Sequence, residues 1–546
     1  MLRPRDVSAI PPDTAAIGQV VLRPSDPYRL IGEHLAEILQ DAQFAALYEP
    51  TGRAALSPAL LALVTLFQFQ ENLPDRDAAR QVAVRLDWKY ALHLPLDDPG
   101  FDFTDLHYFR QRLLAHDQER LVFETVLAAI KGFGLLGTHR KQRTDALAVL
   151  GAVADLSRLE LVTETLRLVV RALEETDAAW AEREVPASFR ERYARRQTDY
   201  QLTDAARTAA LLEAGRDGVW LLARLDAAGS PSVRALAEIA TLRTVWEQHY
   251  RVVDGALTLR VEAVNAKERI VTPHDPDVRV GEKRGKVWHG DKVHVTETTD
   301  DGEPRFLTDL TTANASSGDG EELPAIRAHL EASDLTPHEQ NVDAGYISGK
   351  QLADSRAAGI ELIGPALPDT SPNGFKIADF QIDRATKTAT CPAGKAAIKW
   401  SARTTRDGST AANIQFAAAD CAGCAWRPQC TTSQTGRSLQ LNEHYEILMA
   451  RRADAETAEF RTQMHRRAGI EATLSELVRQ HGLRHHRYRG AAKRVLENLL
   501  KGAACNLKRL ARVLAARRGQ PTATAAAPLH RPRYALDQPS FFSYAC

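Results

Sequence analysis

The sequence predicts an α/β protein in which a mixed sheet is flanked by helices and joined to an all-helical N-terminal domain, a helical insertion and a small cysteine-rich insertion. Three observations support this prediction. Apolar residues recur at helical spacing up to about residue 135 and again at 156–253, whereas from about residue 284 the periodicity changes to two. Four of the six cysteines cluster in a segment of polar turns, 371–445.

The charge balance gives no bulk sign of a nucleic-acid partner, because Lys+Arg and Asp+Glu both number 70 in the 546 residues. Any such sign must therefore be local. The most apolar stretch, about 54–69, is too short to span a bilayer, and the N-terminus lacks the apolar run of a signal peptide. We therefore expect a cytoplasmic protein with no membrane partner and, in that reducing compartment, no disulfides.

The first part of the chain is expected to be helical. Residues 1–24 are rich in Pro and Asp and are expected to form a flexible tail, and a helical domain follows at 25–135. Ser57-Pro58 is typical of a helix start, with an N-cap residue followed by Pro at the first helical position. Helices are expected at 59–70, 75–92 and 104–114.

The sheet is expected to come from two parts of the chain, 136–155 and 255–370. The first part leads into a strand. The second part shows the order hairpin, helix, strand, helix, strand, which is typical of a mixed sheet flanked by helices. Its elements are expected at 292–298, 305–311, 323–332, 339–343 and 359–363, with the hairpin turn at Asp300-Asp301-Gly302. The helical stretch between the two parts, 156–254, is interpreted as a structural insertion that also shapes an interface.

The cysteine-rich segment, 371–445, is followed by helices at 446–515 and by a flexible tail, 516–546. A C-x-x-C pair at its centre has one further cysteine on each side; the four are Cys391, Cys421, Cys424 and Cys430. Four thiolates satisfy a tetrahedral structural Zn²⁺, which would hold together a segment with little core of its own. Reduced, metal-free cysteines are the main alternative, and a redox pair or an iron–sulfur cluster are weaker ones.

Metal-dependent phosphodiester chemistry needs a few carboxylates that converge on hard ions such as Mg²⁺. Asp145 follows a basic segment where a first strand is expected, and Asp343 lies where a later strand gives way to a glycine turn. Glu471 lies on a late helix. Composition alone cannot select these three from 70 acids, because most acids are turn or surface residues. Equally good candidates on that basis are Asp275, Asp277 and Asp291.

The selection of these acids comes from a resemblance. The motifs Gln142-Arg143-Thr144-Asp145, Val342-Asp343-Ala344-Gly345-Tyr346 and Arg467 to Glu471 resemble those of the DDE transposases of bacterial insertion sequences, and more closely the group numbered eleven eighty-two. The resemblance extends from about Leu22 to about Leu514. It implies an RNase H-like core with the first aspartate on its first strand, the second after its fourth strand, and the glutamate on the helix that closes the site.

The resemblance also implies a function. The three acids would hold Mg²⁺ or Mn²⁺, as two ions, in a DNA transposase that cuts DNA at transposon ends and joins a 3′-hydroxyl to target DNA. The partners would be the terminal repeats and target DNA, with a homodimer or higher oligomer pairing two ends. The domain at 25–135 is a candidate for binding those ends, and a packing role is an equal alternative. A catalytically inactive, zinc-stabilised DNA-binding relative and another RNase H-fold nuclease remain open.

Two positions depart from the family pattern. Related transposases often carry a Tyr three residues before the Arg and a Lys seven residues after the Glu, where this chain has Met464 and Val478. The roles of that Tyr and Lys therefore cannot be carried over. Arg467 can be, as a phosphate contact near the scissile bond. An ion pair with Glu471, four residues later on the same helix, is the alternative role for Arg467.

The region after Glu471 is basic. From Arg479 to Arg518 there are roughly twelve Lys and Arg residues and one acid, Glu497. Phosphate contacts of such a stretch would be largely independent of DNA sequence. A surface helix without a partner is the alternative. The predicted DNA contacts besides Arg467 are Arg479, Arg484, Arg487, Arg489, Lys493 and Arg494.

Overall fold

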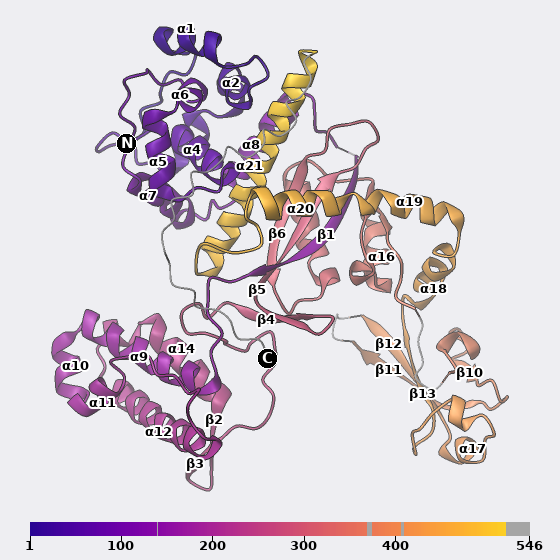
Figure 1. Ribbon diagram of the computed structural model, residues 1–546. Coiled ribbons are helices and arrows are strands. Elements are labelled where there is room, and N and C mark those ends of the chain that lie inside the picture. Colours follow the sequence, from indigo (N-terminus) through magenta and orange to yellow (C-terminus); the bar gives the residue numbers. More distant parts are fainter. Residues whose placement is uncertain (139, 369–373, 406–408, 520–546) are drawn as a thin grey trace.

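The computed structural model describes residues 1–138, 140–368, 374–405 and 409–519. Figure 1 shows the N-terminal helices at the top, the sheet in the centre, the helical insertion at the lower left and the strands near the cysteines at the lower right. Within these residues, no helix is long and apolar enough to cross a membrane. Most of the predicted tail 516–546 lies outside the described residues.

The N-terminal helices pack around one buried helix, α4 (Pro58–Gln70). Its predicted start is confirmed: the Ser57 side chain accepts a hydrogen bond from the Leu60 N–H at 3.1 Å. All its residues up to Phe69 are buried, so α4 is the centre of this unit. The other helices are α1 (Pro12–Val21), α2 (Pro27–Glu33), α3 (Leu35–Ile38), α5 (Asp75–Val84), α6 (Leu86–Ala91), α7 (Thr104–Ala115) and α8 (Leu121–Gly132).

Two expectations for this region differ from the structure. Residues 1–24, expected to be a flexible tail, contain α1, and the buried Thr14 hydroxyl donates to the Leu94 carbonyl at 2.7 Å. The helix expected at 75–92 is interrupted at Arg85, whose backbone is extended and whose guanidinium pairs with acids on both sides. In both cases side-chain contacts of the folded chain override the local sequence signal.

The central sheet is mixed. β1 (Lys141–Leu150) lies between β5 (Lys286–Thr298), which is antiparallel to it, and β7 (Glu339–Asn341), which is parallel to it. β6 (Leu307–Asn314) and β8 (Glu361–Ile363) continue the sheet outwards, so the order is β6-β5-β1-β7-β8. The predicted hairpin of β5 and β6 is confirmed.

One further strand, β4 (Arg279–Lys283), is absent from the predicted elements. It pairs with the first half of β5, so β5 is longer than the predicted strand at 292–298. Two helices connect the later strands: α15 (Leu323–Ala332) lies between β6 and β7 in the chain, and α16 (Gly349–Ala357) lies between β7 and β8.

The C-terminal helices join the sheet to the N-terminal unit. α21 (Ala491–Arg517) packs against α4, α8 and β6, and these four elements contribute to one hydrophobic core. Much of α21 is therefore buried, although its sequence is basic. The helices before it are α18 (Tyr445–Asp454), α19 (Ala458–Ala468) and α20 (Ile470–Gln480).

The two remaining regions have small hydrophobic cores of their own. In the helical insertion these residues come mainly from α9 (Arg158–Thr176), α12 (Asp204–Ala228) and α14 (Ala237–His249). It also contains α10 (Ala178–Glu184), α11 (Ala187–Arg192), α13 (Pro231–Arg234) and the strands β2 (Tyr250–Val253) and β3 (Ala256–Leu259). The cysteine-rich region contains β9 (Gln381–Asp383), β10 (Thr388–Thr390), β11 (Ala397–Thr404), β12 (Thr410–Phe416), α17 (Ala418–Ala422) and β13 (Ser438–Asn442).

Candidate active site

Asp145 and Asp343 lie near each other because their strands are parallel neighbours. Arg143 of β1 pairs with Asn341 of β7, and each aspartate follows two residues later, so both point to the same side of the sheet. The Asp145 side chain is 7% exposed and that of Asp343 is 25% exposed. Asp343 accepts a hydrogen bond from the Gly345 N–H at 2.8 Å, which fixes its carboxylate where the strand ends.

Arg467, near the end of α19, bridges the two aspartates. Its Nη2 lies 2.7 Å from Asp145 Oδ2 and 3.8 Å from Asp343 Oδ2. The alternative ion pair with Glu471 is not formed among the residues that the structure describes. Arg467 therefore faces the sheet rather than its own helix.

Glu471 lies in the first turn of α20 and is exposed. Its charge acts on Asp145 in the sheet. Burial raises the pKa of Asp145, the charge of Arg467 lowers it, and the charges of Asp343 and Glu471 raise it further. The charges of the other two predicted acids therefore act on Asp145.

A buried ion pair beneath these acids was not predicted. Arg143 donates to Glu297 Oε1 from Nε at 2.8 Å and from Nη2 at 2.6 Å, and its Nη1 donates to the Arg466 carbonyl at 2.5 Å. Gly469, between α19 and α20, permits this close approach, because a Cβ there would lie 2.2 Å from Arg143 Nη1. Arg143 is part of the motif that contains Asp145. Glu297 carries no comparable signal, because its partner is 154 positions away in the sequence.

The predicted DNA contacts beyond Arg467 fall into two groups, and the first is exposed. It consists of Arg479, Arg484, Arg489 and Lys493. Two of these follow the end of β1: Arg484 donates to the Ala148 carbonyl at 3.0 Å, and Arg489 donates to the Ala152 carbonyl at 2.9 Å. Their guanidinium groups form no ion pair with an acid that the structure describes, so their charge is available to a ligand.

The second group, Arg487 and Arg494, is less exposed, and the burial of Arg494 argues against its predicted DNA contact. The Arg494 side chain is 2% exposed and pairs with Asp275 and Asp291. Arg487 is half-buried, with its guanidinium over the Phe69 ring. The same pairing makes Asp275 and Asp291 poor alternatives as metal ligands, because a buried guanidinium already neutralises them.

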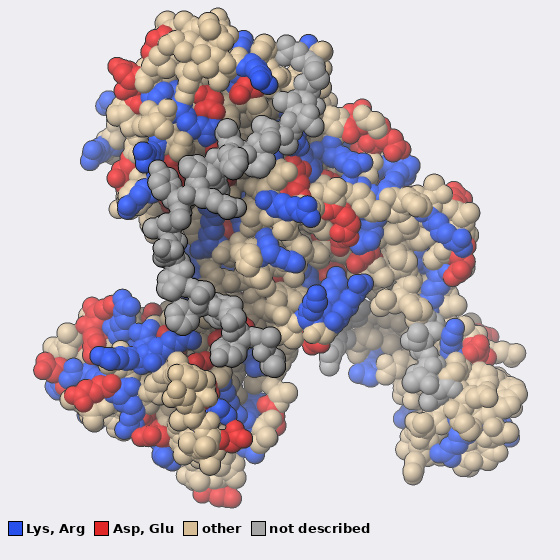
Figure 2. All heavy atoms as spheres, viewed as in Figure 1, with Lys and Arg blue, Asp and Glu red and all other residues tan. Residues whose placement is uncertain are grey.

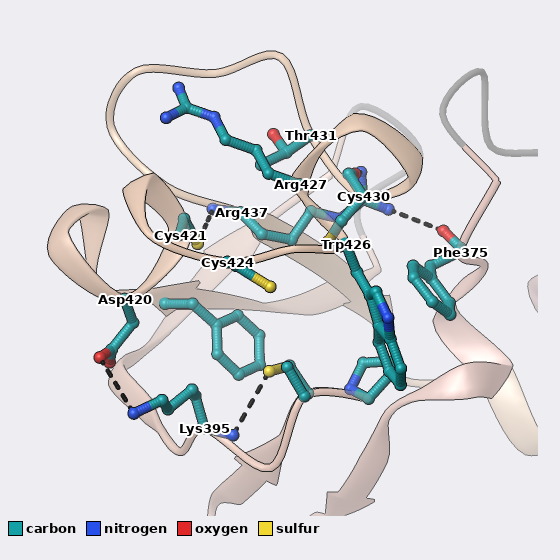
Figure 3. A pocket seen from close by; sticks show the side chains of 14 residues that line it. Phe375, Lys395, Asp420, Cys421, Cys424, Trp426, Arg427, Cys430, Thr431 and Arg437 are labelled. Atoms are coloured by element: carbon teal, nitrogen blue, oxygen red, sulfur yellow. Dashed lines mark hydrogen bonds and ion pairs between the residues drawn. The ribbon is translucent and has the colours of Figure 1, made fainter.

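The four clustered cysteines line one cavity, shown in Figure 3. All four are free thiols. Two of the sulfur atoms accept hydrogen bonds from backbone N–H groups, Cys391 from Lys395 and Cys421 from Arg437, each at 3.4 Å. Such donors stabilise a thiolate, the form of cysteine that binds metal.

The cysteines also influence one another electrostatically. Burial raises the pKa of the Cys430 thiol, Arg437 lowers it, and the charges of the other three cysteines raise it further. A divalent cation among them would relieve this repulsion. The four donors are of the type that a structural Zn²⁺ prefers, but among the described residues no three of these sulfur atoms lie within 4.8 Å of one another.

A second group of metal-binding residue types lies between α20 and α21. Within the described ranges, one set of three such side chains has its ligand atoms all within 4.8 Å of one another: Glu476, His481 and Cys505. Burial lowers the pKa of His481 to about 4 and raises that of Cys505 to about 12. Arg509 donates to Glu476 at 2.9 Å. A cation would have to be placed beside this guanidinium, so we interpret the set as core packing.

Comparisons with known proteins cover one of the three motifs, Arg467 to Glu471, whereas Asp145 and Asp343 lie outside the matched residues. Residues 390–511 match a family model described as a transposase DDE domain, and residues 18–112 match one described as a transposase domain (DUF772). The first match contains the cysteines, Arg467 and Glu471, and the second covers most of the N-terminal helices. Neither curated proteins nor solved structures gave a match. The two matches support a DDE-type transposase family and indicate a transposase.

Proposed function

We propose that this chain is a DNA transposase that binds the ends of an insertion sequence and catalyses metal-dependent strand cleavage and strand transfer into target DNA. The observation that carries the proposal is the meeting of Asp145, Asp343 and Arg467 on one side of the sheet, within the field of Glu471. The two transposase family matches support it. The narrower insertion-sequence group rests on the sequence motifs alone.

The strand order supports an RNase H-like core. β6, β5 and β1 are antiparallel neighbours, and β7 and β8 extend the sheet parallel to β1. With β4 set aside as an addition, β1 is the first strand and β7 the fourth. Asp145 then lies on the first strand and Asp343 directly after the fourth, as the motifs imply. The helical insertion interrupts the core between its first and second strands.

Carboxylate oxygens are the ligands that Mg²⁺ and Mn²⁺ prefer, and one of these is the proposed cofactor, as two ions. When bound, the ions activate the attacking oxygen and stabilise the leaving oxygen. Asp145 and Asp343 would supply ligands from the sheet, and Glu471 would supply one from α20. The Arg467 guanidinium, held beside the two aspartates, suits an oxygen of the phosphate to be cleaved.

The remaining assignments belong to the same proposal. The four clustered cysteines would hold a structural Zn²⁺, and their sulfur atoms would draw together around it. The exposed basic residues Arg479, Arg484, Arg489 and Lys493 would contact DNA phosphates. The N-terminal helices would bind the terminal repeats, and a homodimer or higher oligomer would pair two ends.

The test is cleavage and strand transfer on DNA that carries the element's own ends. Wild type, Asp343→Asn and a matched control, Asp277→Asn, are compared in Mg²⁺, in Mn²⁺ and without metal, with DNA binding measured in parallel. Asp277, which composition alone could not separate from the three acids, is exposed and lies just before β4. We expect metal-dependent products from wild type and the control. Asp343→Asn should bind DNA and give at least a hundredfold less product, as on the order of 10² or more is lost when a group that stabilises the transition state is removed.

The other outcomes separate the alternatives. Binding without metal-dependent cutting in wild type would indicate the inactive DNA-binding relative. Cutting that does not depend on the end sequence and gives no strand transfer would indicate another nuclease. Full activity of Asp343→Asn would exclude the proposed site.

A further inference from the structure

The β4–β5 hairpin ends in a tight, basic turn. β4 ends at Lys283, β5 begins at Lys286, and these two lysines are paired directly across the hairpin. Arg284 and Gly285 form the turn with φ of +54° and +74°. Both lysines and Arg284 are exposed, and so is the next residue, Val287. The turn therefore presents three cations to solvent.

Two features of this turn work against the stability of the isolated hairpin. A two-residue turn with positive φ at both positions favours Asn, Asp or Gly, and Arg at the first of them is strained. Like charges that face each other across a strand pair also destabilise it, as Lys283 and Lys286 do. Both costs are understandable if the cations are there to bind a ligand with several negative charges.

The three cations are free to do so. None of them forms an ion pair with an acid in the part of the chain that the structure describes. Arg279, at the other end of β4, differs: its guanidinium is held by the carbonyls of Lys267 and Val278, at 2.8 and 3.0 Å. In Figure 1 the hairpin is drawn below β1 and β6 and runs across the view toward β11 and β12, and Figure 2 shows Lys and Arg side chains on the surface of that region.

The base of the hairpin lies beside the end of β1. Leu150, the last residue of β1, pairs with Gly290 of β5, and the hairpin extends beyond that point. The loop after α20 runs along the same edge, since the Leu150 N–H donates to the Arg484 carbonyl at 2.9 Å. That loop brings the side chains of Arg484 and Arg489 to the end of β1. Unpaired cations therefore lie both at the end of β1 and at the tip of the hairpin that starts beside it.

We propose that the tip of the β4–β5 hairpin, Lys283, Arg284 and Lys286, binds the phosphate backbone of the DNA duplex that lies over the carboxylate site. The inference rests on the proposed function and adds a DNA contact outside the predicted ones. Contacts to phosphates carry no sequence information, so the tip adds affinity for any duplex. Each phosphate contact displaces condensed counterions, which makes binding depend on salt.

The experiment measures the salt dependence of DNA binding by the full-length protein, in an Asp343→Asn background without divalent metal, so that cutting does not interfere. The probes are a duplex with the element's end and a scrambled duplex of the same length. The test variant is Lys283→Gln/Arg284→Gln/Lys286→Gln. With about 0.9 lost per phosphate contact, the slope of log K against log salt should become shallower by about 2 to 3, and by the same amount for both duplexes.

Three matched variants separate charge from structure. Lys283→Arg/Lys286→Arg keeps the charges and should keep the wild-type slope. Glu282→Gln removes the acid beside the tip and should bind DNA more tightly. Lys387→Gln removes a cation from another turn, where φ is also +54°, and should leave the slope unchanged. Arg284→Gln should make the slope shallower by about 1.

The possible failures are distinguishable. A triple variant that binds with the wild-type slope overturns the hairpin proposal and leaves the proposed function standing. An equal loss in Lys387→Gln and Arg284→Gln also overturns it, because the effect would not belong to this hairpin. A protein that binds neither duplex at low salt overturns the proposed function itself.

Discussion

Replacing Glu297 by Gln tests how the helix that carries Glu471 is held against the sheet. Glu297 is fully buried, and its two oxygens have different partners. Oε1 accepts from Arg143 of β1, whereas Oε2 accepts from Thr473 of α20 at 2.7 Å and from Arg509 of α21 at 3.0 Å. One carboxylate therefore joins three elements around the candidate site.

The magnitude follows from the charges left behind. Glu297→Gln keeps the shape of the side chain, but Arg143 and Arg509, whose side chains are 1% and 11% exposed, lose their shared counter-charge. Breaking a buried ion pair by removing one partner costs about 3 to 5 kcal/mol. The amide nitrogen of Gln is also a donor and would face donors of the same kind. We therefore expect the free energy of unfolding of the sheet and its C-terminal helices to fall by about 3 to 5 kcal/mol.

The assay is hydrogen exchange on the full-length protein, with thermal unfolding in parallel. Amides of α19 and α20 should exchange faster in Glu297→Gln, whereas α9 and α12, which belong to a separate core, should keep wild-type rates. Glu476→Gln is the matched control, because Glu476 also pairs with Arg509 but is 14% exposed and does not touch Arg143. Glu476→Gln should lose less stability than Glu297→Gln. Unchanged exchange in α20, or equal acceleration in the insertion, would refute the reasoning.

Two further predictions concern pH and metal. Burial lowers the pKa of His486, but the adjacent carboxylates Asp291 and Glu497 outweigh this and raise it overall. Protonated His486 contributes its full stabilisation at pH values below its pKa in the unfolded chain, about 6.5. This contribution is lost as the pH rises through the pKa of His486 in the folded protein. The stability advantage of wild type over His486→Gln in urea should therefore shrink from pH 6 to pH 9, and a constant difference would contradict the prediction. Full-length wild type should bind one Zn²⁺ per chain, and Cys424→Ser should bind none. Amides of β11–β13, but not those of α12, should exchange faster in the variant. Four freely reactive thiols in zinc-supplemented wild type would contradict this.

The sequence predicts best where the signal is local. The Ser57-Pro58 start of α4 and the β5–β6 hairpin follow from a cap and a turn, and both are found in the structure. The position of Asp343 at the end of a strand also follows from the local change of pattern. The meeting of Asp343 with Asp145 does not, because the register of β1 with β7 joins segments about two hundred residues apart. Only the resemblance to a family anticipated it.

The errors have a common physical cause, which is pairing over long sequence distances. Thr14 is buried through a bond to Leu94, and Arg494 is buried through acids more than two hundred residues before it. A count of charges along α21 cannot reveal this, because the acids that pair with Arg494 come from β5 and the segment before β4. Basic composition alone therefore overstated the DNA-binding role of the C-terminal helices.

The same reasoning shows where a DNA-binding surface can lie. A fully buried cation that is already paired in the fold, such as Arg494, gains little from a phosphate, because the new contact would have to replace a buried ion pair. Arg467 differs, because its side chain is 24% exposed and its partners are the proposed metal ligands. An exposed cation without an acidic partner releases counterions when it binds and gains the full effect. On this criterion Arg494 is excluded, Arg484 and Arg489 remain, and the hairpin tip is added. The proposed DNA contacts therefore rest on the distribution of unpaired cations near the end of β1, and not on the number of basic residues.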